Sequence, residues 1–202
     1  MKRKWWIYLS FILCCGLGAC SKDANLGPER GEVIQFGKTV DEGSESISWV
    51  VLECEDGKAL LLSEEVVAYC EFHKKTNTGI EWHESDVCTW LNTEFYEEVF
   101  ATEEKEKILS TKVQTKKYGS NSADSVENKV FLLDTREVQE YVSDTEYARV
   151  DTEESVSGWL LRDKGQNQSY IVYVDKEGNI INSGTEMNKK QGIRPAIWIS
   201  VD

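Results

Sequence analysis

The sequence predicts an α+β fold, in which one domain carries a mixed or antiparallel sheet and short helices are inserted between N- and C-terminal strands. Two patterns support this class. Strand-like runs of apolar residues gather near both ends of the chain, from residue 33 and from residue 158, whereas the middle places its apolar residues at helical spacing. The hydrophobic share of 40% is sufficient for a packed core, which argues against a wholly disordered chain.

The first strands are predicted from residue 33 onward. Residues 47–52 (Ile-Ser-Trp-Val-Val-Leu) are typical of a strand, and residues 59–63 (Ala-Leu-Leu-Leu-Ser) of a second one. Asp56 and Gly57 lie between them, and an Asp-Gly pair flanked by apolar runs favours a tight hairpin. We therefore expect residues 47–63 to form two antiparallel strands.

Helices are predicted in the middle of the chain. Ser85 is placed to cap a short helix over residues 86–91, and Phe95, Val99 and Phe100 share one helical face. Thr102 is placed to cap another helix that reaches residue 109.

A polar surface loop is predicted for residues 118–128. Asp134 and Glu137 then have the spacing of a capping box and predict a helix through Tyr141.

The last third of the chain is predicted to be rich in strands. Residues 158–162, 169–174 and 193–201 are the strand candidates, and residues 175–179 have the composition of a hairpin turn. We expect the strands at the two ends of the chain to share one sheet.

The first twenty residues have the pattern of an export signal. Residues 2–4 (Lys-Arg-Lys) are basic, and residues 5–17 are an apolar stretch shorter than the roughly 20 residues that a membrane-spanning helix needs. Small residues and Cys20 follow, and this end resembles the lipobox of bacterial lipoproteins, in which the cysteine is acylated and becomes the first residue. The resemblance implies a signal peptide at residues 1–19 and, at residues 20–32, the lipidated Cys20 and a tether. It implies an extracytoplasmic domain at residues 33–202, held at the bacterial cell membrane by its lipid.

Acidic residues outnumber basic ones. There are 36 Asp and Glu against 23 Lys and Arg, and the formal net charge is −13. Loss of residues 1–19, which contain three basic residues, leaves 20 basic against 36 acidic residues and a net charge of −16. Because phosphate contact needs a basic face, this charge argues against nucleic acid as a partner. It also predicts that the lipid, rather than the protein surface, holds the domain at an anionic membrane.

An ordered series of short motifs resembles an uncharacterised domain family of bacterial cell-surface proteins. The series comprises Trp49-Val-Val-Leu, Ala59-Leu-Leu-Leu-Ser, Trp82, Ser85, Trp90-Leu-Asn, Phe95, Lys129-Val-Phe-Leu-Leu, Glu137, Gly158-Trp-Leu-Leu-Arg, Gly178 and Gly192-Ile-Arg-Pro-Ala-Ile-Trp-Ile. The match covers nearly the whole chain after the tether. Cys88 departs from it, because the family has an arginine there.

The closing motifs also resemble the C-type-lectin-like fold of formylglycine-generating enzymes. This resemblance implies that the first and last strands pair and that the helices pack on one side. The copper-binding cysteine pair of those enzymes is not recognisable in this sequence.

Three cysteines remain after Cys20. In an oxidising compartment, we expect a disulfide between Cys70 and Cys88, with Cys54 left over. A zinc site of Cys70, His73, His83 and Cys88 is the alternative, although this is not a known finger spacing.

The arginines and tryptophans of the motif series have two interpretations each. Arg162 and Arg194 could bind a carboxylate or phosphate of a ligand, or they could pair with acidic residues and orient the strands. The tryptophans could stack on a sugar, or they could pack in the core, which their apolar neighbours favour. These tryptophans are Trp82, Trp90, Trp159 and Trp198.

No catalytic motif and no Gly-rich phosphate loop is present, and the sequence indicates no cofactor. The favoured hypothesis is therefore a lipid-anchored cell-surface module that binds a glycan, a peptide or a neighbouring surface protein. One alternative is an enzyme of the formylglycine-generating-like fold that acts on exported substrates. The other is a metal or redox sensor that uses the Cys and His residues.

Overall fold

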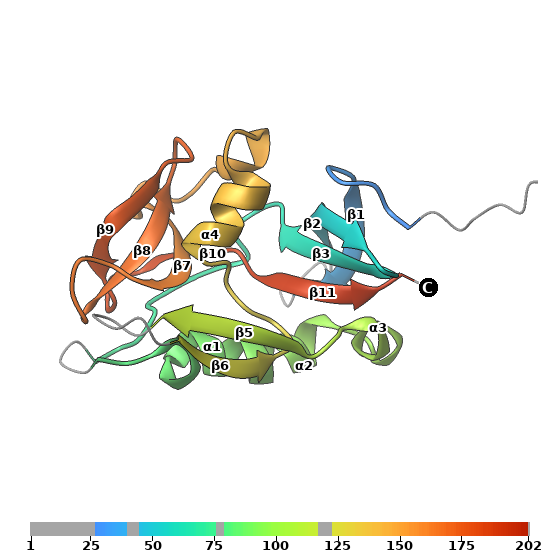
Figure 1. Ribbon diagram of the computed structural model, residues 1–202, viewed down its shortest axis with the longest axis horizontal. Coiled ribbons are helices and arrows are strands. Elements are labelled where there is room, and N and C mark those ends of the chain that lie inside the picture. The colour runs from blue at the N-terminus through green and yellow to red at the C-terminus, as the bar shows by residue number, and fades with distance from the viewer. Residues whose placement is uncertain (1–26, 40–44, 76–78, 117–122, 202) are drawn as a thin grey trace, which may run out of the picture.

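The strands of the protein form two larger sheets and one hairpin, and short helices lie on more than one side of them (Figure 1). The computed structural model describes residues 27–39, 45–75, 79–116 and 123–201. Cys20 lies outside the described residues, so the lipidation prediction is not addressed by the fold.

The first sheet has four strands, all antiparallel, in the order β1-β2-β3-β11. They are β1 (Val33–Lys38), β2 (Ser46–Glu55), β3 (Lys58–Ser63) and β11 (Ala196–Ser200). The N- and C-terminal strands therefore share a sheet, as expected. They do not pair with each other, because β2 and β3 lie between them, so the strand pairing implied by the lectin-like resemblance is wrong.

The turn between β2 and β3 confirms the predicted hairpin. Glu55 pairs with Lys58, and the two residues between them, Asp56 and Gly57, have φ values of 48° and 72°. Two successive residues with positive φ match the twist of a two-residue hairpin, and Asp-Gly tolerates them best.

The second sheet has five strands in the order β4-β10-β7-β8-β9. They are β4 (Ala68–Cys70), β7 (Gly158–Lys164), β8 (Tyr170–Asp175), β9 (Ile180–Glu186) and β10 (Gln191–Ile193). Strand β10 runs parallel to β7 and the other pairs are antiparallel, so this sheet is mixed. Together with the helices, the two sheets confirm the α+β class.

The single strand predicted over residues 193–201 is wrong, because two strands in different sheets replace it. Strand β10 ends at Ile193 in the second sheet, and β11 begins at Ala196 in the first. The crossing falls at Arg194 and Pro195, where the missing N–H of proline breaks the ladder.

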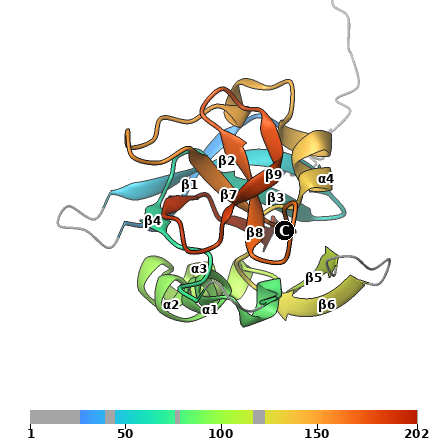
Figure 2. The same cartoon turned by 90° about the vertical axis from the view of Figure 1, so that its left-hand side faces the viewer.

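The helices of the described residues are short, and they all lie between β4 and β7 in the sequence. They are η1 (Trp82–Glu84), α1 (Asp86–Trp90), η2 (Leu91–Phe95), α2 (Tyr96–Val99), α3 (Thr102–Lys107), α4 (Thr135–Glu137), η3 (Val138–Val142) and η4 (Glu146–Ala148). The segments η2 and η3 are π-helical turns. Figure 2 shows α1, α2 and α3 on one side of the strands and α4 on the other.

Two of the three predicted helix starts are confirmed. The Ser85 hydroxyl accepts a hydrogen bond from the backbone N–H of Cys88 at 3.1 Å. Asp134 and Glu137 form the capping box, in which each side chain accepts from the other residue's N–H, at 2.7 and 2.8 Å. Thr102 is not a cap, because Ala101 takes that position and its N–H donates to Glu104.

The loop predicted over residues 118–128 is wrong for its second half. Residues Ala123–Asn128 form β6, which pairs antiparallel with β5 (Thr111–Lys116). Val113 and Val126 stand opposite each other and pack against the core. Apolar residues on one face of a hairpin thus outweigh its polar composition.

Candidate functional site

The side chain of Arg162 is buried and makes all of its hydrogen bonds within the protein. The side chain is 1% exposed, and its Nη2 lies 2.9 Å from Asp134 while its Nη1 lies 2.5 Å from Glu137. Nη1 also donates to Leu132 O, Nη2 to Glu137 Oε1 and Nε to Gln114 O, so each of the five N–H groups of the guanidinium has a partner. This geometry matches the structural interpretation, in which Arg162 pairs with acidic residues and orients the strands.

The pKa of Arg162 is raised above its ordinary value. Burial acts to lower it, but the hydrogen bond and charge of Glu137 and the charge of Asp134 outweigh the burial. Arg162 is therefore charged, and it forms ion pairs with Asp134 and Glu137, the two residues of the capping box of α4.

Arg194 lies where the chain passes from one sheet to the other. Its side chain donates to Ser63 O from Nε and Nη2, at 3.0 and 2.8 Å, and to Tyr147 O from Nη1 at 2.7 Å. The guanidinium carbon stands 4.8 Å from the centre of the Trp159 ring. Burial lowers the pKa of Arg194 to about 9. Among the described residues its partners are thus carbonyls and an indole rather than the expected carboxylates.

The predicted disulfide between Cys70 and Cys88 is not formed in the structure, where Cys54, Cys70 and Cys88 are free thiols. The Cys88 sulfur lies in the core beside Asn128, at 3.7 Å from its Nδ2. Cys70 lies on β4 and lines a surface hollow that Cys88 does not line. The two sulfurs therefore face different environments.

The four residues of the zinc alternative do not converge. No group of three or more His, Cys, Asp and Glu side chains in the described part of the chain could hold a metal ion. His73 Nδ1 lies 3.2 Å from Asp86 Oδ2, without the geometry of a hydrogen bond, and His83 is exposed.

The tryptophans divide between core and surface. Trp82 and Trp159 are fully buried, as the core interpretation predicts. Their N–H groups donate to Asn128 Oδ1 and Ala148 O. Trp90 and Trp198 are half-buried, and Trp90 is the one that lies in a groove.

Two surface hollows meet at Trp90, and we call them together the Trp90 groove. One has a volume of about 510 Å³ and lies between β4 and α1, and the other has about 630 Å³ and lies between the start of β2 and α2. The residues lining the first are Ala68–Glu71, Lys74, Asp86, Val87, Thr89, Trp90, Thr93 and Glu94. Those lining the second are Thr39, Glu45–Ser48, Glu65–Val67, Trp90, Phe95, Glu98 and Val99. Figure 2 shows these strands above α1 and α2 on the left.

The continuous helical segment formed by α1, η2 and α2 carries three groove residues on one face. Trp90, Glu94 and Glu98 follow each other at four-residue intervals, and the π-helical turn η2 lies between the first and the last. The Trp90 ring packs against Phe95 with 5.2 Å between ring centres, which fixes its position. π-Turns inside helices are frequent at functional sites because they redirect side chains.

Negative charge dominates the groove. Six carboxylates line it, whereas Lys74 is the single basic residue among the lining residues. The carboxylates belong to Glu45, Glu65, Glu71, Asp86, Glu94 and Glu98. Burial and the charges of Glu71 and Asp86 raise the pKa of Cys70 to about 11, so its thiol stays protonated at neutral pH and is a poor nucleophile.

A small α+β domain with a charged surface groove is therefore the class that the fold and the site define. Residues 56–201 match the model of a family described as a Domain of unknown function (DUF6273), and the chain belongs to this family. No curated protein and no solved structure matches the chain. None of the helices in the described residues is both long and apolar enough to cross a membrane.

Proposed function

We propose that this protein is a lipid-anchored extracytoplasmic binding module and that the Trp90 groove is its binding site. The basic residues 2–4, the apolar residues 5–17 and Cys20 support an acylated N-terminus. A diacylglyceryl group on the Cys20 sulfur, often joined by an N-acyl chain in this class of lipoprotein, supplies more than one membrane signal and gives stable anchoring.

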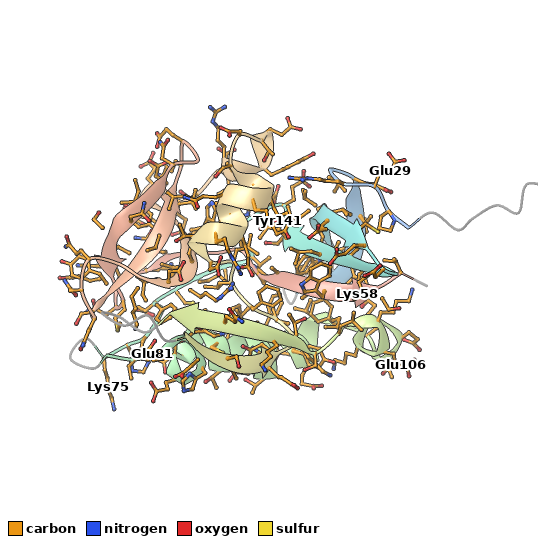
Figure 3. All side chains as sticks on the ribbon, in the orientation of Figure 1. Glu29, Lys58, Lys75, Glu81, Glu106 and Tyr141 are labelled. Atoms are coloured by element: carbon orange, nitrogen blue, oxygen red, sulfur yellow. The ribbon has the colours of Figure 1, made fainter. Side chains whose placement is uncertain are left out.

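The position of the tether relative to the groove supports this proposal. Gly27 lies beside Cys54 and Val201, since a Cβ built on it would stand 3.1 Å from the Cys54 sulfur and 3.0 Å from Val201 Cγ2. The chain thus enters the domain at the end of the first sheet that holds the β2–β3 turn and Lys58 (Figure 3). The groove lies at the other end of the same hairpin, where β2 begins and β3 ends. At about 3.3 Å per residue, β2 separates the two ends by roughly 30 Å.

The single observation that carries the binding function is the groove itself. It lies at the junction of two sheets and the helices, with a half-buried aromatic ring between two hollows, which is the usual setting of a ligand site. Its one thiol has a pKa raised to about 11, which favours binding over a catalytic cysteine. An enzyme of the lectin-like fold is not favoured, because β1 and β11 are separated by two strands and do not pair.

Metabolic labelling with an alkyne fatty acid tests the anchor. We expect labelled protein in the membrane fraction for the native chain, and loss of the label for Cys20→Ala. Cys54→Ala, the same change at an exposed free thiol of the domain, should keep the label. Protease added to cells with an opened envelope should digest the anchored domain. Label on the Cys20→Ala chain would contradict the anchor.

Glycan and peptide arrays test the groove. The native chain in detergent and Trp90→Ala are compared on the same arrays, with Trp198→Ala as the control at the second half-buried tryptophan. We expect ligands whose signal depends on Trp90 and not on Trp198. If every signal survives Trp90→Ala, the groove is not the binding site.

A further inference from the structure

We propose that the occupant of the Trp90 groove is an extended, lysine-rich segment of another protein, which adds to the free edge of β4 and places an ammonium group over Trp90. This inference rests on the proposed binding function and names the ligand class of the same site.

An open strand edge lies in the wall of the groove. Strand β4 is the edge of the second sheet, and among the described residues it pairs with β10 alone. All three of its residues, Ala68, Tyr69 and Cys70, line the hollow of about 510 Å³. Unpaired backbone groups on an edge bind extended peptides as an added strand, so this wall offers main-chain hydrogen bonds to a peptide rather than to a sugar.

The charge of the groove selects a basic partner. Six carboxylates face one lysine along the two hollows, and Glu45, Glu65, Glu94 and Glu98 are exposed. The carboxylates occur in both hollows, three in each. A ligand with a single positive charge would balance one of the six carboxylates, whereas an extended chain with repeated ammonium groups complements both hollows.

Trp90 links the two hollows. It is a lining residue of both, and indole is the aromatic group that binds cations best. Because side chains of an extended peptide alternate, a segment lying along β4 turns every second residue to the same side. Lysines at alternate positions would therefore reach Trp90 and the carboxylates of the helix face.

Fluorescence anisotropy tests this inference. The probe is a fluorescein-labelled peptide of alternating lysine and threonine, about ten residues long, and the protein is the full chain in a neutral detergent. We expect saturable binding that weakens when salt is raised from about 0.05 to 0.5 M, because salt screens exposed charges.

Two charge-matched double variants locate the binding. Glu94→Gln with Glu98→Gln removes two exposed carboxylates from the groove, and Glu103→Gln with Glu106→Gln removes two exposed ones from α3 (Figure 3). We expect about fivefold weaker binding for the first pair, from roughly 0.5 kcal/mol per exposed charge, and no change for the second. Trp90→Ala should weaken binding about tenfold. Equal effects of the two pairs would overturn the inference.

Modified peptides separate charge from strand addition. A peptide with acetylated lysines should not bind. Two further peptides carry N-methyl groups on all lysine amides or on all threonine amides, and strand addition requires that just one of them loses binding, because alternate N–H groups face β4. Equal binding of both peptides would refute the docking on β4.

The outcome also distinguishes this inference from the proposed function. A Trp90-dependent glycan on the arrays, together with no peptide binding, would leave the binding module in place and overturn the basic peptide. Loss of both would overturn both.

Discussion

Replacement of Arg162 by methionine should destabilise the protein strongly. Methionine has nearly the length of arginine but no charge, so the buried Asp134 and the partly buried Glu137 would keep their positions without the guanidinium. Their side chains are 13% and 21% exposed, against 1% for Arg162. Removing one partner of a buried ion pair typically costs 3–5 kcal/mol, and we expect about 4 kcal/mol here. For a chain of this size the melting temperature should fall by roughly 8–16 °C.

Arg136→Met is the matched control. Arg136 lies on α4, next to the two carboxylates, its side chain is 72% exposed and its Nη2 is 3.9 Å from Asp134. The same chemical change should therefore alter stability by less than about 0.5 kcal/mol. Urea denaturation followed by tryptophan fluorescence measures both variants against the native chain.

A second substitution identifies the cause of the loss. Glu137→Gln keeps an oxygen to accept from the Asp134 N–H but removes one unpaired charge. In the Arg162→Met background it should restore about 1–2 kcal/mol, because part of the cost is the buried carboxylate left alone. A loss below about 1 kcal/mol for Arg162→Met would refute the structural role and return Arg162 to the list of ligand-binding candidates.

Two further predictions concern Cys70 and Asn92. Because burial, Glu71 and Asp86 raise the pKa of Cys70 to about 11, alkylation of its thiol by iodoacetamide should be slow at pH 7. The rate, measured by peptide mass spectrometry, should increase about tenfold per pH unit up to pH 10. A rate independent of pH would contradict the raised pKa. Asn92→Ala should lower the free energy of unfolding by about 2–3 kcal/mol in urea denaturation, since the Asn92 side chain donates to Cys88 O and Val130 O and accepts from the Val130 N–H. Asn182→Ala, the same change at an exposed position, should lower it by less than about 0.5 kcal/mol. Equal losses for the two variants would contradict this role of Asn92.

Local signals in the sequence predicted those parts of the fold that depend on neighbouring residues. The Asp56-Gly57 hairpin and the Asp134–Glu137 capping box form as expected, because their hydrogen bonds join residues within a few positions of each other. The match of residues 56–201 to a domain of unknown function agrees with the predicted resemblance to an uncharacterised domain family.

Features that depend on distant contacts were not predictable in this way. No local pattern in the sequence indicates that the chain changes sheets at Arg194. Which sheet each half joins depends on the distant strands with which it pairs, and residues 193–196 do not reveal those partners. Strand β6 is not predictable from its own residues for a similar reason. Its composition is polar, and its one valine, Val126, packs toward the core only in combination with Val113 on the neighbouring strand. The Trp90 groove combines residues from 45–48, 65–71 and 86–99, and among its lining residues only Trp90 and Cys70 were candidates from the sequence.

The motif series and the groove carry different information about function. Arg194 fixes Ser63, and the residues that follow Ser63 form one wall of the groove, so this motif arginine shapes the site without touching its interior. Trp90 and Phe95 belong to the motifs as well, and they provide the aromatic floor. The six carboxylates lie outside every motif. The motif residues therefore supply the aromatic part of the groove, whereas the carboxylates on which the proposed basic ligand depends stand at other positions of the sequence.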